Sequence, residues 1–159
     1  MFNIICVKFG DKYSSDFVNK LQMDLLSYNP LNSFTFHCYT DNPKGINNSI
    51  NIVNPIGPTL KGVSNKLALF SKEFPIQGKN IYLDLDVCIS NDITSWAGWF
   101  DWDKLSIVHA PWKDNKKRYG RLSNYDVTIH SSVMTWKALS HFEIWNHFSN
   151  HGLRDYYMR

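Results

Sequence analysis

Apolar and polar residues along the chain follow two different periods, one typical of strands and one typical of helices. Six segments have the short apolar or alternating pattern of strands: 3–9, 33–40, 50–53, 80–89, 105–109 and 126–134. Three segments place apolar residues at steps of three and four, as in helices with one buried face: 15–28, 61–74 and 135–147. Strands that alternate with helices predict an α/β layer sandwich around a largely parallel sheet.

The first and last predicted helices can be described residue by residue. The apolar positions of the first helix are Phe17, Leu21, Leu25 and Tyr28. Ser15 is its expected N-cap. In the last helix, Trp136 and Trp145 stand at helical spacing, so we expect both in the core.

The composition narrows the class of protein. The 159 residues contain no internal repeat or linker, so we expect one domain over residues 1–159. With 43% apolar, 15% aromatic and 19% charged residues, the composition excludes disorder, collagen-like repeats and coiled coils. A net charge of +3 is too small to argue for nucleic acid as a partner. No apolar run reaches the roughly 18 residues of a membrane span.

The cysteines bear on the cellular compartment. Cys6, Cys38 and Cys88 are odd in number, lie far apart and stand in apolar, strand-like runs. This pattern favours buried free thiols in a reducing compartment. The first ten residues are typical of a strand and lack the features of a signal peptide. We therefore expect a cytoplasmic protein.

Two carboxylates in the run 80–89 are the main candidates for chemistry. In a strand, Asp84 and Asp86 would share one face, while Leu83, Leu85 and Val87 would share the other. Paired carboxylates after a buried run are tolerated near a strand end, facing water or a cation. They suit Mg²⁺ or Mn²⁺, with substrate phosphates as the remaining ligands. The alternative is one loop-capping aspartate and one solvated aspartate, because D-x-D is a short and common pattern.

Four segments together resemble one group of enzymes. Residues 79–96 read KNIYLDLDVCISNDITSW and resemble the DxD segment of GT-A-fold glycosyltransferases, especially the glycosyltransferase 8 family and similar phage and bacterial enzymes. The other segments are CVKFGDKY at 6–13, NKLALF at 65–70 and HSSVM at 130–134. All four stand in the family's order across nearly the whole chain. The resemblance implies a short, GT-A-like (Rossmann-like) three-layer sandwich.

This resemblance implies a metal-dependent sugar transferase. Asp84 and Asp86 would hold Mn²⁺ (or Mg²⁺), and a nucleotide-diphosphate sugar, expected to be a UDP-sugar, would be the donor. Lys66 would place its charge near the diphosphate or the donor sugar. A sugar or glycan of unknown identity would be the acceptor. Transfer breaks the anomeric C–O bond and leaves negative charge on the diphosphate, which a bound cation stabilises.

Further site residues follow from the same resemblance. The Tyr13 ring would stack on the base, and the backbone around Val7 and Lys8 would read the edge of the base. Ser131 would line the donor sugar, and His130, which takes the place of a frequent asparagine, is a candidate catalytic residue. Apart from the resemblance, Asp126 is a candidate catalytic base on the acceptor side because it stands near a basic cluster, with a turn or strand-start aspartate as the other interpretation of that residue.

The chain also departs from the family pattern. The family's C-terminal histidine, which supplies a third metal ligand, and its neighbouring lysine have no counterpart before Arg159. Three explanations stay open: a minimal enzyme, a shortened form of a longer chain, or half of a site that a partner chain completes. A nucleotide-sugar-binding or oligomer-forming module without turnover is the rival function. A haloacid-dehalogenase-type hydrolase fits less well. In that class the D-x-D motif lies near the N-terminus and is often followed by Gly-Thr, whereas here it lies in the middle of the chain and is followed by Val87-Cys88-Ile89.

Weaker signals allow a structural interpretation beside a functional one. A basic cluster between two predicted strands is a solvated loop or a lid over donor phosphates: Lys113, Lys116, Lys117, Arg118 and Arg121. Trp99, Trp102 and Trp112 could pack or stack on a sugar. The exposed aromatic residues and the short chain favour a homo-oligomer.

Overall fold

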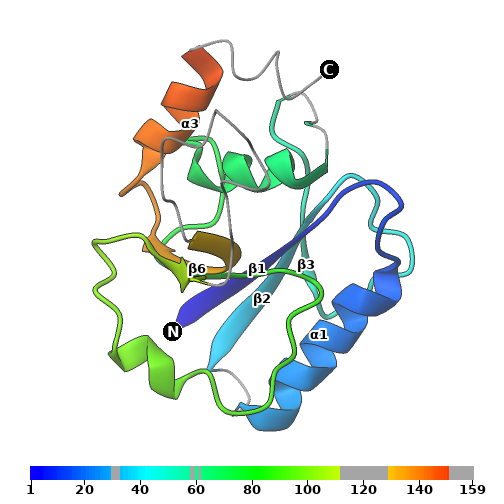
Figure 1. The fold of residues 1–159 in the computed structure, drawn as a ribbon. Helices are drawn as coiled ribbons and strands as arrows, with labels where there is room; N and C mark the ends of the chain where they lie inside the picture. The colour runs from blue at the N-terminus through cyan, green and yellow to red at the C-terminus, as the bar shows by residue number, and fades with distance from the viewer. Residues whose placement is uncertain (30–32, 58–59, 61, 112–128, 151–159) are drawn as a thin grey trace.

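A six-stranded sheet forms the centre of the computed structural model (Figure 1), with strand order β3-β2-β1-β4-β6-β5. The structure describes residues 1–29, 33–57, 60, 62–111 and 129–150. The strands are β1 (Phe2–Lys8), β2 (Phe34–Thr40), β3 (Asn51–Val53), β4 (Lys79–Leu83), β5 (Ser106–His109) and β6 (Ile129–Lys137). Each coincides with or overlaps one of the six predicted strands.

The sheet is mainly parallel, as the alternation of strands and helices predicts. β1 pairs in parallel with β2 and β4, and β2 pairs in parallel with β3. β6 pairs antiparallel with both β4 and β5, so it alone of the six described strands runs in the opposite direction. The carboxyl ends of β1 and β4 therefore meet at one edge of the sheet, which is where ligands bind in open α/β sheets.

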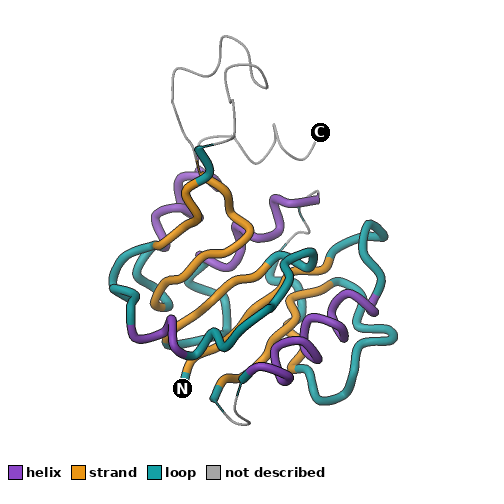
Figure 2. The backbone as a smooth tube through the Cα atoms, turned by 60° about the horizontal axis from the view of Figure 1, so that its bottom comes forward, coloured by secondary structure: helices purple, strands orange, loops and turns teal. Residues whose placement is uncertain are grey.

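Helices cover both faces of the sheet and make three layers (Figure 2). Helix α1 (Ser15–Tyr28) packs on one face, against a core that includes Ile4, Cys6 and Leu83. The 3₁₀ helix η1 (Gly62–Phe70) and helix α3 (Phe142–Asn150) pack on the other face. A short 3₁₀ helix η2 (Ser95–Gly98) precedes β5. This arrangement confirms the expected α/β sandwich.

Helix α1 has the predicted bounds, but its cap and its buried face differ from the prediction. Ser14, not Ser15, is the N-cap, and its hydroxyl accepts a hydrogen bond from the Asp16 amide at 3.2 Å. Phe17 and Tyr28 are exposed by 43% and 49%. The buried residues are Val18, Leu21, Gln22 and Leu25. Leu21 and Leu25 are therefore buried as predicted, whereas Phe17 and Tyr28 are not, and the Phe17 ring packs on Tyr13 instead.

Two other predicted helices are wrong in part. The segment 61–74 forms the shorter 3₁₀ helix η1, whose start is tied down by Asn65. The amide nitrogen of Asn65 donates to the carbonyls of Leu60 and Gly62 at 2.7 and 2.9 Å, and its oxygen accepts from the Leu60 amide. The segment 135–147 begins as the last part of β6 and becomes helical only at Phe142. Trp136 is core as predicted, but it lies in a strand.

The misassigned end of β6 has a physical cause. β6 lies between β4 and β5, and its consecutive residues Met134, Thr135 and Trp136 are all buried. A strand covered on both faces does not alternate between apolar and polar residues, so its sequence resembles a buried helix. β6 ends at Lys137, and the turn that follows contains Leu139, whose φ is 67°.

Two of the three cysteines match the prediction. Cys6 and Cys38 are buried free thiols, and they face each other across β1 and β2. Cys88 is exposed, because the strand that was expected to bury it ends at Leu83. Within the described residues, no helix has both the length and the apolar character needed to cross a bilayer.

Candidate functional site

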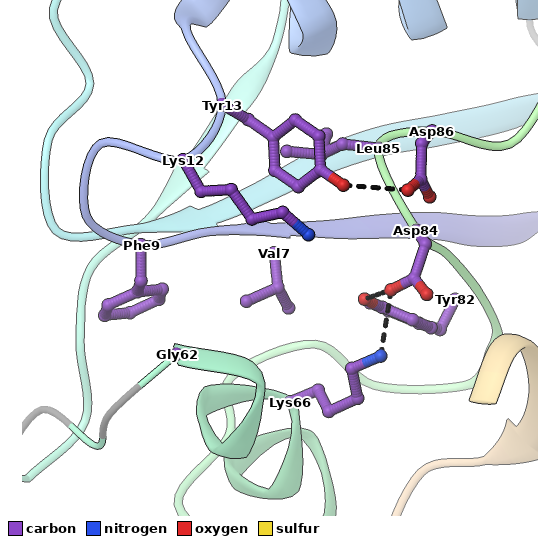
Figure 3. Close-up of a pocket in the computed structure, with 10 residues that line it drawn as sticks. All are labelled: Val7, Phe9, Lys12, Tyr13, Gly62, Lys66, Tyr82, Asp84, Leu85 and Asp86. Carbon is purple, nitrogen blue, oxygen red and sulfur yellow. Dashed lines mark hydrogen bonds and ion pairs between the residues drawn. The ribbon is translucent and has the colours of Figure 1, made fainter.

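A cleft of about 160 Å³ opens at the carboxyl ends of β1 and β4 (Figure 3). Residues from three parts of the chain line it: Val7, Phe9, Lys12, Tyr13, Gly62, Lys66, Tyr82, Asp84, Leu85 and Asp86. Two ammonium groups and two carboxylates are therefore gathered on walls that also carry apolar and aromatic side chains. Five of the residues predicted for the site line this cleft, and a sixth, Ser131, contacts it through Lys66.

The chain leaves the sheet just before the two aspartates. β4 ends at Leu83, and the Asp84 amide makes one more bond to β6, donating to the Ser132 carbonyl at 2.8 Å. The Val87 amide then donates to the Asp84 carbonyl at 3.2 Å and closes a turn. Strand alternation was therefore the wrong reason for placing Asp84 and Asp86 together. They share the cleft because a turn follows the strand, which lets both carboxylates reach partners outside the sheet.

Asp84 is held by two donors on one oxygen. Its Oδ1 accepts from Lys66 Nζ at 2.8 Å and from the Tyr82 hydroxyl. Lys66 Nζ also donates to Ser131 Oγ at 3.2 Å and lies 4.8 Å from the centre of the Tyr82 ring. The Lys66 and Asp84 side chains are only 14% and 26% exposed, so their attraction is less screened than in a surface pair.

The pairing of β6 with β5 is irregular at Ser131, which contacts Lys66 of this cluster. Ile107 of β5 pairs with Met134, but the next residue, Val108, pairs with His130. Residues 131–133 therefore have no opposite residue in β5, which is a bulge. Bulges redirect side chains next to functional sites, and here Ser131 reaches Lys66 from the neighbouring strand.

Asp86 lies on the other wall of the cleft and is held by Tyr13. The Tyr13 hydroxyl donates to Asp86 Oδ2 at 2.7 Å. The Tyr13 ring meets the Phe17 ring edge to face at 4.9 Å, and Lys12 Nζ lies 4.6 Å from its centre. Hydrogen bonding to Tyr13 raises the pKa of Lys12, with smaller contributions from the charges of Asp86 and Asp84.

Tyr82 belongs to the site, although the sequence argument did not identify it. Its side chain is 2% exposed and packs in the core beneath η1. Burial, and then the nearby Asp84 charge, raise the pKa of Tyr82 far above its usual value, so the hydroxyl stays protonated and donates. The available signal was a tyrosine two residues before an aspartate, which puts its one polar atom beside that carboxylate.

The remaining predicted site residues are less central. Val7 lines the cleft, whereas Lys8 is buried and is not among the lining residues that the structure describes. His130 Nδ1 lies 2.7 Å from Ser132 Oγ, and His130 is also absent from the described lining. Asp126 lies outside the described residues, as does the basic cluster at 113–121. The lining residues that were not predicted are Phe9, Lys12, Gly62, Tyr82 and Leu85.

The tryptophans expected near the site have separate roles. Trp102 is buried, and its Nε1 donates to the Ala97 carbonyl at 3.1 Å. Trp99 is 82% exposed. Neither lines the described part of the cleft, and Trp112 lies outside the described residues. Packing is therefore the better description of Trp102.

The chemistry of the donor set suits a divalent cation that shares its coordination with a substrate. No group of three His, Cys, Asp or Glu residues with metal-binding geometry exists among the residues that the structure describes. Asp84 and Asp86 each use one oxygen for protein donors, and within the described residues the other oxygen of each is left without one. Mg²⁺ and Mn²⁺ are commonly held by one or two carboxylates together with phosphates and water. The two aspartates fit that pattern.

Comparison with known proteins finds similarity in structure. No family model and no curated protein matches this sequence. The galactosyltransferase LgtC in complex with donor and acceptor sugar analogs superposes with a TM-score of 0.63 at 15% identity, over 99% of this chain and 66% of LgtC. An active-site mutant of LgtC gives 0.58 at 16% identity, over 91% of this chain and 59% of the mutant's chain.

A second glycosyltransferase shares the same architecture. GlyE from Streptococcus pneumoniae TIGR4 superposes with a TM-score of 0.56 at 12% identity, over 92% of this chain and 36% of GlyE. This chain therefore spans about two thirds of the length of LgtC and about a third of GlyE. At these identities the similarity establishes the fold, which is the GT-A-like α/β sandwich of these glycosyltransferases.

Proposed function

We propose that this chain is a glycosyltransferase that takes a sugar from a nucleotide-diphosphate donor, with a divalent cation held by Asp84 and Asp86. The observation that carries the proposal is the cleft itself, where Lys66, Asp84 and Asp86 meet at the carboxyl ends of parallel strands. Ligands of open α/β sheets bind in this position. The shared fold with LgtC and GlyE supports the same assignment.

The lining of the cleft suits the separate parts of such a donor. Val7, Phe9 and the Tyr13 ring offer an apolar and aromatic wall for a base, and we take uridine as the first candidate. Lys12 and Lys66 supply positive charge for the diphosphate. Ser131, which contacts Lys66 Nζ at 3.2 Å, would be close to the donor sugar.

Asp84 and Asp86 would hold Mn²⁺ or Mg²⁺ through the oxygens that no described protein group occupies. When bound, the cation would act as a Lewis acid that stabilises negative charge on the departing diphosphate. Lys66 would add to that stabilisation, because its ammonium group is fixed between Asp84 and Ser131 before the donor arrives. Charge placed in advance lowers the barrier without the cost of reorganising solvent.

A nucleotide-sugar-binding module without turnover is the second candidate, and one observation favours it. The carboxylates that line the described part of the cleft are Asp84 and Asp86, and both are committed to the cation in our proposal. No further carboxylate or histidine in that lining could remove a proton from an acceptor. The two candidates predict the same donor binding and differ only in turnover.

Release of the nucleotide separates these candidates. The protein is incubated with a panel of UDP- and GDP-sugars in Mn²⁺ or in EDTA, with and without simple sugar acceptors, and free UDP and GDP are measured. A glycosyltransferase releases one nucleotide in Mn²⁺ and not in EDTA, and faster with an acceptor. A binding module protects the donor and releases none. Asp86→Asn is the matched control for any release that is seen, because it keeps the shape of the side chain and removes the charge that would hold the cation.

A further inference from the structure

Each aspartate of the cleft is held by a tyrosine hydroxyl, and the two tyrosines come from different walls. Tyr82 in β4 donates to Asp84, and Tyr13 in the loop before α1 donates to Asp86 (Figure 3). Both bonds reach a single oxygen of the carboxylate, which is Oδ1 in Asp84 and Oδ2 in Asp86. Each carboxylate of the cleft is thus bound by a tyrosine hydroxyl in the same way, through one oxygen only.

The surroundings of the two tyrosines hold their hydroxyls in place, and so fix the orientations of the Asp84 and Asp86 carboxylates. The Tyr82 ring is 2% exposed and packs in the core beneath η1, so its hydroxyl has little freedom to move. Lys66 adds a second bond to the same Oδ1 and leaves Oδ2 of Asp84 without a described partner. Tyr13 is half-buried, and the edge-to-face contact with Phe17 restrains its ring.

We propose that Tyr82 and Tyr13 are positioning residues that leave each aspartate one oxygen for a cation, and so favour Mn²⁺ or Mg²⁺ over Ca²⁺. This inference rests on the proposed function, because it concerns the cation of that same site. Single oxygens from two carboxylates suit a small octahedral ion that keeps water and phosphate ligands. Ca²⁺ takes six to eight oxygens and commonly uses both oxygens of a carboxylate, which the tyrosines oppose.

The test compares cation affinities of tyrosine variants that lack only a hydroxyl. Tyr82→Phe and Tyr13→Phe are titrated with Mn²⁺ and, separately, with Ca²⁺ in the presence of UDP. Tyr39→Phe is the control for Tyr82, because Tyr39 is also 2% exposed and its hydroxyl accepts from the Ile56 amide. Tyr28→Phe is the control for Tyr13, because Tyr28 is a half-exposed residue at the far end of α1.

We expect Mn²⁺ affinity to fall about tenfold or more in Tyr82→Phe and Tyr13→Phe, as is usual when a partner of a metal ligand is removed. Ca²⁺ affinity should change less, so the ratio of Mn²⁺ to Ca²⁺ affinity falls. The ratio stays at the wild-type value in both controls. Wild-type ratios in both test variants would overturn the inference and leave the proposed function standing. A wild-type protein that binds neither cation with UDP would instead overturn the proposed function.

The design does not depend on one variant. Tyr82 is buried, so circular dichroism and thermal unfolding first establish whether Tyr82→Phe is folded. Tyr13 is only partly buried and packs at the edge of the core, and Tyr13→Phe keeps the ring that makes this contact, so it remains a valid test if Tyr82→Phe is unstable. An unchanged ratio in Tyr13→Phe alone would then count against the proposal.

Discussion

Polar side chains gather at both ends of the central strands, but they differ in charge and in exposure between the two ends. At the carboxyl end, Lys66, Asp84 and Asp86 are charged and face an open cleft. Toward the amino end, Asn3 and His37 are neutral groups packed between neighbouring strands. Asn3 Nδ2 donates to Asn80 Oδ1 at 3.0 Å and to the Gln77 carbonyl at 2.7 Å, and Asn3 Oδ1 lies 3.3 Å from His37 Nε2.

The difference shows which polar cluster is built for a ligand. The Asn3 amide at the amino end donates to Asn80 and to the backbone of the segment before β4, which is a structural task. Two neighbouring polar atoms, His37 Nδ1 and Asn80 Nδ2, are buried with no partner in the described structure. Charged groups at the carboxyl end cost more to desolvate than amides, and they border open space that a ligand could fill. Changes at the two ends should therefore have different effects.

The largest effect is expected for the aspartates of the carboxyl end. Asp84→Asn and Asp86→Asn keep the shape of the side chain and remove the negative charge that would hold the cation. We expect donor turnover to fall about 100- to 1000-fold, the cost of losing one strong electrostatic contact in a transition state. Release of free nucleotide measures this loss. Turnover within twofold of wild type in both variants would mean that the active site does not lie at the charged, carboxyl end of the sheet.

Lys66→Met should change the affinities for Mn²⁺ and for UDP in opposite directions. Lys66 opposes the charge of Asp84 before any ligand binds, so its removal leaves the full negative charge of that carboxylate to attract a cation. Mn²⁺ binding without UDP is expected to tighten, while UDP binding weakens about tenfold or more through loss of a charged hydrogen bond. Calorimetry with each ligand alone measures both changes. Lys20→Met is the control, because Lys20 forms an exposed pair with Asp24 on α1.

A change at the amino end should affect folding and leave the cleft alone. Asn3→Ala removes the hydrogen bonds to Gln77 and Asn80 and leaves buried polar atoms unpaired. The free energy of unfolding should fall by about 1–3 kcal/mol, as measured by urea denaturation, while UDP binding by the folded protein stays at its wild-type value. Asn48→Ala, at an exposed position, should change neither quantity. A loss of UDP affinity in Asn3→Ala would contradict the purely structural role of the amino end.

The smallest effect concerns pH and His37. Burial lowers the pKa of His37 below its usual value of 6.5. Because the unfolded chain then binds the proton more readily than the native chain, stability is complete above pH 6.5 and declines as the pH falls toward the native pKa. In urea denaturation between pH 7 and pH 5, His37→Gln should lose less stability than the wild type. Equal pH slopes would show that His37 is not buried as a neutral group.

The sequence predicted some parts of this molecule better than others for physical reasons. The α1 bounds and the Asp84 and Asp86 pair were predictable, because apolar spacing and charge next to an apolar run are local properties. The end of β4 was not, because Asp84 leaves the sheet to meet Lys66, which is distant in sequence. Tyr82 was missed because a tyrosine in an apolar strand normally indicates core, although its place two residues before Asp84 puts its hydroxyl beside that carboxylate.

The most direct test of the account is a calorimetric titration of the wild-type protein and Asp86→Asn with UDP, in Mn²⁺ and in EDTA. The central claim is that the charged end of the sheet binds a nucleotide diphosphate together with a divalent cation. We predict that UDP binds the wild type in Mn²⁺, and that binding is lost or weakened at least tenfold in EDTA and in Asp86→Asn. UDP binding that is equal with and without Mn²⁺, and unchanged in Asp86→Asn, would contradict the claim.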